Sequence, residues 1–234
     1  MKRAYGLNYF VAVAVLITCC GSCKKQSPII GCTDKAAVNY NGTGPCYYSG
    51  TAIFYVDVAI PTGSTIGVSL DSQSQGQTIL SSYTGVPSYE TIGCASFSEN
   101  WTNSSMKTVA YKASGQGSLS PGNWSGNVTF TGNQCTPVLL PSGGVTFYTS
   151  DSTYVNNALK DILVSFNICG CQIGITQNYP SAPNYGASGC ANFILPLGTY
   201  SYTAYANNDG TYYKTWTGSF SIGADKQYTI IQLQ

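Results

Sequence analysis

Hydrophobic and polar residues alternate along this chain in short runs, which is the pattern of β-strands with one buried face. The alternation is clear in residues 51–58 and again at Tyr200, Tyr202 and Ala204. Clusters of Gly, Pro, Asn and Ser separate the runs, as turn residues do between strands. A single helical turn, at residues 155–159, is the most helix that the pattern allows. The chain is therefore predicted to be all-β.

The runs form two groups of seven predicted strands. The first group lies at residues 51–58, 65–70, 77–81, 94–97, 107–113, 124–131 and 137–140. The second lies at residues 145–149, 161–166, 172–176, 190–195, 200–205, 215–222 and 227–233. Seven short strands in about 90 residues are typical of an antiparallel β-sandwich. We expect one sandwich at residues 50–140 and a second at residues 141–234.

The two groups also match each other in sequence. Residues 66–97 align without a gap with residues 162–193, at an offset of 162 − 66 = 96 residues. Gly93-Cys94-Ala95, for example, matches Gly189-Cys190-Ala191. A unit repeated at this length indicates two similar domains in tandem.

Composition and charge exclude several classes of function. Of 234 residues 8% are charged, the net charge is +1, and no cluster of Lys and Arg suits a nucleic acid. Histidine is absent, which removes Ser-His and Cys-His nucleophilic sites and His-containing zinc sites. Glu90 and Glu99 are the only glutamates, and their counterparts in the second repeat are Gly186 and Leu195. We therefore expect no enzyme, no catalytic residue, no metal and no cofactor.

The N-terminus has the features of an export signal. Lys2 and Arg3 precede an apolar run at residues 10–17, which is too short to cross a bilayer, and three cysteines follow it: Cys19, Cys20 and Cys23. This order resembles a bacterial lipoprotein signal, which implies that residues 1–23 are the signal and lipidation region. It also implies a membrane contact through acyl chains on one of the three cysteines. The alternative is an ordinary cleaved secretory peptide.

A short polar tether, residues 24–28, follows the three cysteines, and a cysteine motif follows the tether. Residues 31–41 read Gly-Cys-Thr-Asp-Lys-Ala-Ala-Val-Asn-Tyr-Asn, and Cys46 closes the segment. The motif resembles the GCTD module of Bacteroidota-type envelope lipoproteins, and we assign residues 24–49 to the tether and this motif. The acidic pair that usually ends the module is missing here, so a Cys32–Cys46 disulfide is expected rather than a calcium site.

A second resemblance lies in the second repeat. Residues 195–202 read Leu-Pro-Leu-Gly-Thr-Tyr-Ser-Tyr, similar to the turn of prealbumin-like or carboxypeptidase-regulatory-like modules, which are Ig-like sandwiches. Some relatives carry a Lys–Asn cross-link, but the first strand of each repeat has no lysine, so no cross-link is expected.

The remaining cysteines suit an oxidising compartment. They are Cys94, Cys135, Cys169, Cys171 and Cys190. We expect Cys94 to pair with Cys135, and Cys190 to pair with either Cys169 or Cys171, which leaves one cysteine unassigned.

Aromatic residues supply the candidate binding site. Both repeats contain Tyr-x3-Pro-x-Tyr-x3-Gly-Cys, with its tyrosines at Tyr83, Tyr89, Tyr179 and Tyr185. Such tyrosines either stack on a ligand or pack inward to hold their own loop. Trp101 has no counterpart and is predicted to be an exposed contact, whereas Trp124 and Trp216 lie on matching strands and are predicted to pack.

Taken together, the sequence predicts a non-catalytic, lipid-anchored protein of the cell envelope, attached to the outer membrane. Its expected role is a structural spacer or an adhesin-like or ligand-binding module, with a surface glycan or an envelope protein as partner. Glycan binding through the tyrosine loops is the first alternative, and a hydrolase using scattered carboxylates is the second. Lys24-Lys25-Gln26-Ser27 has no acidic stretch, so the side of the membrane that the protein faces stays open.

Overall fold

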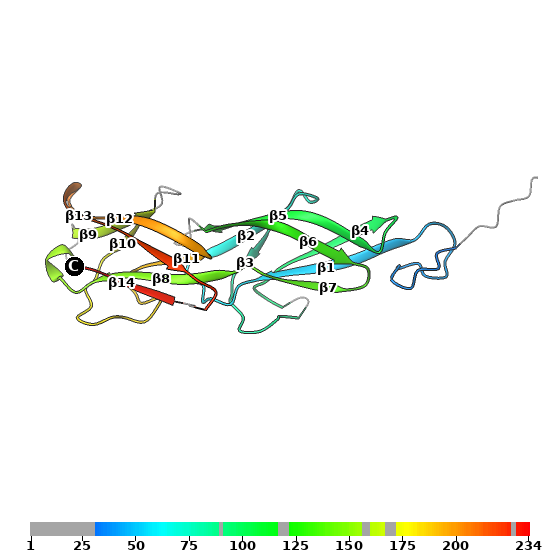
Figure 1. Ribbon diagram of the computed structural model, residues 1–234, viewed down its shortest axis with the longest axis horizontal. Helices are drawn as coiled ribbons and strands as arrows, with labels where there is room; N and C mark the ends of the chain where they lie inside the picture. The colour runs from blue at the N-terminus through cyan, green and yellow to red at the C-terminus, as the bar shows by residue number, and fades with distance from the viewer. Residues whose placement is uncertain (1–30, 89–90, 117–121, 156–159, 167–171, 226–227) are drawn as a thin grey trace, which may run out of the picture.

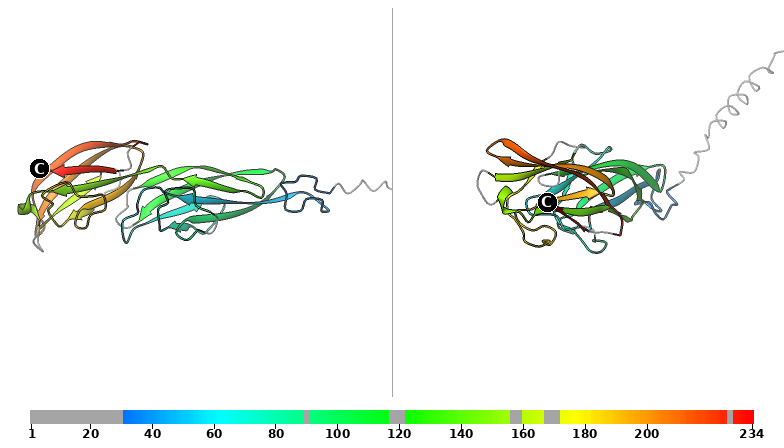
Figure 2. Two further views of the ribbon diagram at one scale, coloured as in Figure 1. Left: turned by 90° about the horizontal axis from the view of Figure 1, so that it is seen from below. Right: turned by 60° about the vertical axis from the view of Figure 1, so that its left-hand side comes forward.

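The computed structural model describes residues 31–88, 91–116, 122–155, 160–166, 172–225 and 228–234. Two β-sandwiches follow one another along the long axis of the molecule, and a small cap precedes the first of them (Figures 1 and 2). The predicted lipidation cysteines Cys19, Cys20 and Cys23 lie outside the described residues.

Sandwich 1 has a sheet of three strands and a sheet of four, in the orders β4-β1-β7 and β3-β2-β5-β6. Its strands are β1 (Tyr47–Tyr55), β2 (Thr65–Leu70), β3 (Gln77–Ile79), β4 (Ala95–Thr102), β5 (Met106–Gln116), β6 (Asn123–Thr131) and β7 (Cys135–Leu139). In the smaller sheet β1 is antiparallel to β4 and parallel to β7.

Sandwich 2 has the same strand order, in the sheets β11-β8-β14 and β10-β9-β12-β13. Its strands are β8 (Ser142–Thr149), β9 (Lys160–Phe166), β10 (Gln172–Ile175), β11 (Ala191–Pro196), β12 (Gly198–Asn208), β13 (Thr211–Ile222) and β14 (Tyr228–Leu233). The predicted all-β sandwich class is confirmed. The helical turn lies at Ser152–Tyr154 instead, because Val155 has an extended backbone, and residues 156–159 are outside the described residues.

The two cores are built from equivalent aromatic contacts. Phe54 packs edge-on against Tyr111 with ring centroids 4.9 Å apart, and Phe147 packs against Tyr202 at 4.8 Å, both at 64°. Each tyrosine lies opposite a glycine of the neighbouring strand. A Cβ on Gly218 would be 2.7 Å from the Tyr202 hydroxyl oxygen, so glycine leaves the space that the ring occupies.

The two tryptophans of the Trp-x-Gly motif close the sandwiches in the same way. Trp124 Nε1 donates to the carbonyl oxygen of Pro141 at 3.0 Å, just after β7, and Trp216 Nε1 donates to that of Gln234, just after β14. Both tryptophans pack against their own core. They are therefore structural, as predicted.

The sandwiches are joined by packing as well as by the chain. Ile194, on β11 of sandwich 2, is completely buried and belongs to the hydrophobic core of sandwich 1, and Tyr185 packs against the same core. Neighbouring residues Phe193 and Leu195 point into the core of sandwich 2, since side chains alternate along a strand. β11 therefore contributes side chains to the cores of both sandwiches.

The N-terminal cap (residues 31–46) is closed by the predicted Cys32–Cys46 disulfide. Its polar side chains Asp34 and Asn39 bond within the cap and to the start of β1. Asp34 accepts hydrogen bonds from Ala36 N at 2.9 Å and from the Tyr48 hydroxyl at 2.8 Å, and these bonds lower the pKa of its carboxyl group. Asn39 bridges the segment, since it donates to Pro45 O at 2.9 Å and accepts from Tyr47 N at 3.0 Å.

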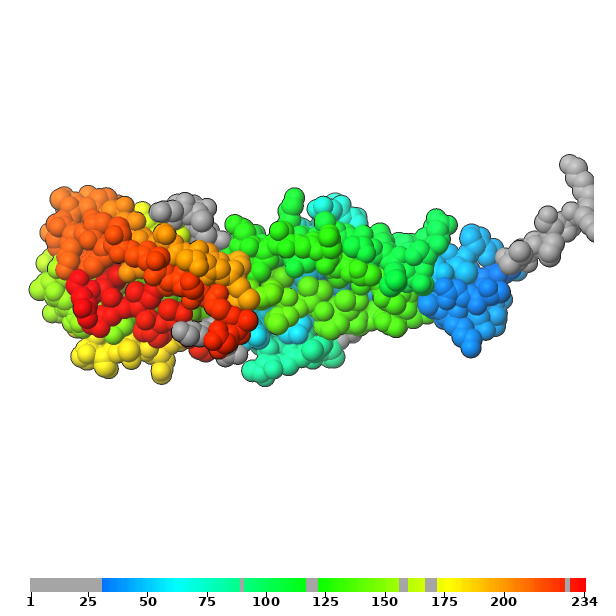
Figure 3. Space-filling view, viewed as in Figure 1, coloured from blue at the N-terminus to red at the C-terminus, as the bar shows by residue number. Residues whose placement is uncertain are grey.

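The cap is fixed to the end of sandwich 1, where it forms a small lobe (Figure 3). Asn133 Nδ2 donates to Ala36 O at 3.1 Å, and the Tyr48 ring stacks on Trp101 with centroids 6.0 Å apart. Trp101 also donates from Nε1 to Ser104 O at 2.6 Å. The prediction of an exposed contact residue at Trp101 is therefore corrected: the ring is partly buried between the cap and the core of sandwich 1.

The other two predicted disulfides are wrong. Cys94, Cys135 and Cys190 are free thiols. Cys94 precedes Ala95, which pairs with Phe54 on one side of β1, whereas Cys135 pairs with Thr51 on the other side. Two strand spacings, about 9–10 Å, already exceed the roughly 7 Å that a disulfide tolerates between Cα atoms.

Cys190 is free and 6% exposed, in the loop before β11. Burial raises the pKa of its thiol to about 11. It lines a hollow of about 270 Å³ with Pro61 and Thr62 of sandwich 1, so its side chain lies at the junction between the sandwiches. Its predicted partners Cys169 and Cys171 lie outside the described residues.

Candidate functional site

The tyrosine loops fold alike in both sandwiches. The Tyr83 hydroxyl donates to the carbonyl oxygen of Ile92, and the Tyr179 hydroxyl donates to that of Ser188 at 2.6 Å. In each loop a glycine with left-handed backbone follows, Gly93 at φ 95° and Gly189 at φ 73°. These bonds hold the loop closed from within.

Tyr185 is also used by the fold. Its ring stacks on Tyr228 with centroids 4.6 Å apart and covers Gly144, where a Cβ would lie 2.4 Å from the ring. Burial, with a smaller effect of Tyr228, raises the pKa of the Tyr185 hydroxyl well above its usual range. Tyr89 lies outside the described residues. The contacts of the other three tyrosines favour the structural interpretation of these loops.

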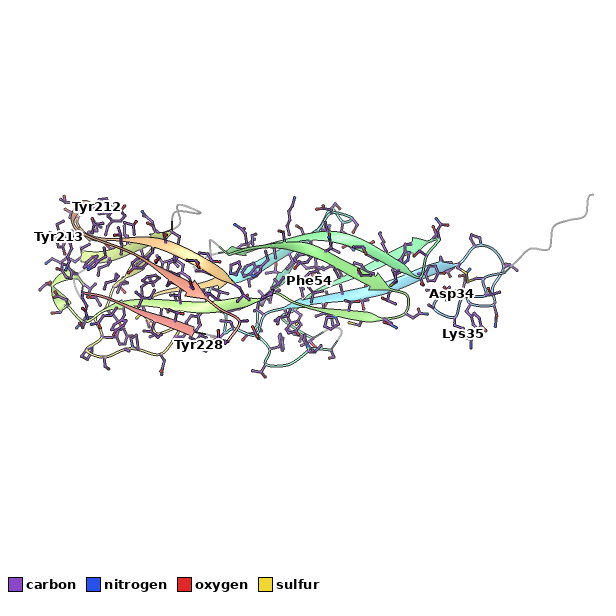
Figure 4. The ribbon with its side chains drawn as sticks, in the orientation of Figure 1. Asp34, Lys35, Phe54, Tyr212, Tyr213 and Tyr228 are labelled. Atoms are coloured by element: carbon purple, nitrogen blue, oxygen red, sulfur yellow. A yellow bond between two sulfur atoms is a disulfide. The ribbon has the colours of Figure 1, made fainter. Side chains whose placement is uncertain are left out.

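A different set of aromatic side chains gathers at the far end of sandwich 2. The hairpin of β12 and β13 turns at Asp209 and Gly210, whose φ angles of 51° and 82° suit a two-residue type I′ turn. This turn extends both strands beyond their predicted ends. Tyr212 and Tyr213 follow the turn after Thr211 and project from the end of the molecule opposite Asp34 and Lys35 of the cap (Figure 4).

A β-bulge sets the direction of Tyr213. Asn207 of β12 pairs with Tyr212, and Ala206 pairs with Lys214, so Tyr213 is the extra residue on β13. Bulges re-aim side chains and are frequent next to binding and active sites. Here the bulge leaves Tyr213 48% exposed beside Tyr212, which is 56% exposed.

The exposed pair rests on partly buried neighbours. Tyr213 stacks on Tyr154 with centroids 5.9 Å apart, and Tyr212 contacts Tyr205 at 5.2 Å. The rings of Tyr154 and Trp216 in turn pack edge to face, with centroids 5.2 Å apart. We call the six side chains around the hairpin the distal aromatic cluster: Tyr154, Tyr205, Tyr212, Tyr213, Lys214 and Trp216.

Lys214 sits inside this cluster. Its Nζ lies 4.8 Å from the centroid of the Tyr154 ring and 4.7 Å from that of Trp216, and it donates to the Tyr154 hydroxyl at 2.9 Å. Cation–π contacts of this kind hold aromatic rings in place. Asp151 supplies a negative charge nearby. Hydrogen bonds from Thr153 and the positive charge of Lys214 lower the pKa of its carboxyl group.

The cluster can bind but offers little chemistry. Ring faces held by neighbours give contact area at low entropy cost, and hydroxyl groups at their edges can exchange hydrogen bonds with a ligand. Among the described residues, no three His, Cys, Asp or Glu side chains gather closely enough to hold a metal ion. Buried Glu99 lies elsewhere, on β4, and pairs with Lys107 at 2.7 Å.

The sequence held one unused signal for this site. Asp209-Gly210 between runs of alternating residues is a strong hairpin signal. It would have placed Tyr212 and Tyr213 beside a tight turn. The bulge and the packing of Tyr154 beneath them depend on pairing across the sheet, which the local sequence does not show.

In the described part of the chain, no helix is long and apolar enough to span a membrane. No protein-family model matches the chain, and no curated protein matches it.

Two solved structures are similar in part. The Bacillus anthracis TIE protein is 14% identical over 80% of this chain and 34% of its own length, with a TM-score of 0.26. The Streptococcal ancillary pilin is 13% identical in sequence over 79% of this chain and 62% of its own length, with a TM-score of 0.21. This chain thus spans about a third of the first and less than two thirds of the second. At these scores the likeness gives no information on function.

Proposed function

We propose that this protein is a non-catalytic, lipid-anchored envelope protein that holds a binding surface away from the membrane. One observation carries the proposal. Tyr212 and Tyr213 are exposed at the end of the molecule opposite the N-terminal cap, which follows the predicted anchor (Figure 4). Single exposed tyrosines are ordinary, but two adjacent ones that pack on further aromatic rings form a contiguous patch, which supports a contact surface at this end.

The rest of the molecule suits a stiff spacer. Cap and sandwich 1 are joined by Trp101, and the two sandwiches share Ile194. Only Leu140 and Pro141 lie between the end of β7 at Leu139 and the start of β8 at Ser142, so little free chain separates the sandwiches. A short connection with buried contacts limits bending between domains.

A surface glycan is the ligand class that we propose for the distal aromatic cluster, because aromatic faces and hydroxyl groups both suit sugar rings. The test is binding of the full-length protein to a glycan array. We expect Tyr212→Ser combined with Tyr213→Ser to lower binding by tenfold or more. Tyr40→Ser, which removes a 43% exposed tyrosine from the cap, is the matched control and should leave binding unchanged. Equal binding by all variants would refute the role of the cluster.

Anchoring has its own test. The intact mass of protein extracted from membranes should include acyl chains on Cys19, Cys20 or Cys23. A mature chain without acyl groups would refute the anchor while leaving the distal aromatic cluster as a candidate binding surface.

A further inference from the structure

The outer face of the four-stranded sheet of sandwich 1 carries a hollow of about 700 Å³, on the strands β3, β2, β5 and β6. This volume lies within the roughly 300–1,000 Å³ typical of small-ligand sites. The hollow is far in the chain from the distal aromatic cluster and shares no residue with it.

Two rows of residues in register form its floor. Thr78, Gly67, Ser114 and Asn123 lie side by side across the four strands. Ser69, Lys112 and Ser125 form the next row on the same face, two residues along each strand. Every member of both rows lines the hollow.

The absence of a side chain at Gly67 opens the floor. Its neighbours Ile66 and Val68 point into the core, so a side chain at position 67 would point outward into the hollow. A Cβ there would lie 3.0 Å from Gln116 Nε2, the movable end of a side chain. The position can therefore accept a larger residue without a change in the core.

In sandwich 2, larger side chains occupy the positions equivalent to this floor. The row equivalent to Thr78, Gly67 and Ser114 is Gly174, Leu163 and Tyr205, as the pairing of β10, β9 and β12 shows. Leucine stands where sandwich 1 has glycine, and tyrosine stands where it has serine. The two sandwiches share strand order and core contacts, yet among the described residues these two positions of sandwich 2 carry large side chains where those of sandwich 1 leave the face open.

The lining is polar and carries a positive charge. Lys112, Ser114, Asn123 and Ser125 make no side-chain hydrogen bond to any described residue, so their donors and acceptors are available. No acidic side chain is found among the described lining residues, and Lys112 supplies the cation. Hydroxyl and amide groups around one ammonium group match a ligand with many hydroxyl groups and a carboxylate.

We propose that this hollow is a binding site for an acidic oligosaccharide. Ser114, Asn123 and Ser125 exchange hydrogen bonds with sugar hydroxyl groups, and Lys112 pairs with a sugar carboxylate. The site is independent of the distal aromatic cluster, so the two can fail separately.

The test is calorimetric titration of the full-length protein with two probes of equal length, tetramers of galacturonic acid and of galactose. We expect the acidic tetramer to bind more tightly. Gly67→Leu, which introduces the residue of sandwich 2, should weaken binding by tenfold or more because it occupies the floor. Lys112→Gln should weaken only the acidic tetramer, by about two- to fivefold, as for an exposed ion pair.

Asn127→Leu is the matched control. Asn127 is exposed on the same strand and face as Asn123 and Ser125 but does not line the hollow, so the added leucine should not affect binding. Ser114→Tyr introduces the second residue of sandwich 2 and replaces Gly67→Leu if the latter does not fold.

Three outcomes would overturn the proposal. They are no binding of either tetramer to the unchanged protein at millimolar concentration, equal binding after Gly67→Leu and Ser114→Tyr, and tighter binding of a tetraglutamate peptide than of the acidic tetramer. The last would make the hollow a peptide site.

Discussion

Ile194 is the residue through which the two sandwiches should be coupled in folding. It is fully buried, it comes from sandwich 2, and its neighbours are the core residues of sandwich 1. Replacing a buried isoleucine by alanine costs about 2–5 kcal/mol through lost burial and the cavity left behind. The contact exists only when both sandwiches are folded. The substitution should therefore lower the interaction free energy between the sandwiches.

The tryptophans supply separate reporters, since Trp124 lies in sandwich 1 and Trp216 in sandwich 2. Urea unfolding would be followed by fluorescence in variants that keep only one of them, with phenylalanine at the other positions. In the otherwise unchanged protein the two curves should coincide. With Ile194→Ala they should separate, and the total free energy of unfolding should fall by about 2–5 kcal/mol.

Ile175→Ala is the control. Ile175 is equally buried, but it lies in the core of sandwich 2 alone. It should lower the midpoints of both curves together while they still coincide, because the Ile194 contact is intact. If the two curves also stay coincident with Ile194→Ala, as with Ile175→Ala, then β11 does not couple the sandwiches through Ile194 and the stiff-spacer proposal loses its main support.

Three further predictions concern the cap and the thiols. Replacing Cys32 and Cys46 by serine should destabilise the cap by about 3 kcal/mol, seen as faster proteolysis at residues 31–46, whereas unchanged proteolysis would contradict it. The pKa of the Asp34 carboxyl is lowered in the folded protein, so its stabilising effect is present above the unfolded value near 4 and is lost as pH falls through the folded pKa. Asp34→Asn should therefore flatten the acid part of a stability–pH curve, and an unchanged curve would count against it. Iodoacetamide should label exposed Cys135 in the native protein and react with Cys190 only slowly, because that thiol is buried and its pKa is raised to about 11. Equal rates, or no reaction in the unfolded protein, would show that these thiols are placed or paired differently.

Local sequence determined much of the fold. Alternation in residues 51–58 and 200–205, with turn residues between runs, gave the strands, because a strand with one buried face needs a period of two. The Cys32–Cys46 disulfide could also be predicted, since its ends are close in the chain and belong to one compact segment.

Sheet order, by contrast, could not be derived from the sequence. β1 lies between β4 and β7, which places Cys94 and Cys135 on opposite sides of it. Trp101 looked exposed because it has no counterpart in the second repeat, yet the docked cap covers it. Both errors have the same cause. The strands on either side of β1, and the cap and Trp101, are adjacent in the fold but far apart in the chain.

The candidate sites divide in the same way. The sequence by itself determined which residues are aromatic or polar and which face of each strand they occupy. Tertiary structure alone decided that the loop tyrosines close their own loops, that the Tyr213 bulge projects at the far end, and that Gly67 opens a polar hollow. The physical reason is that strand pairing joins distant segments in a fixed register, and a surface exists only after that register is set.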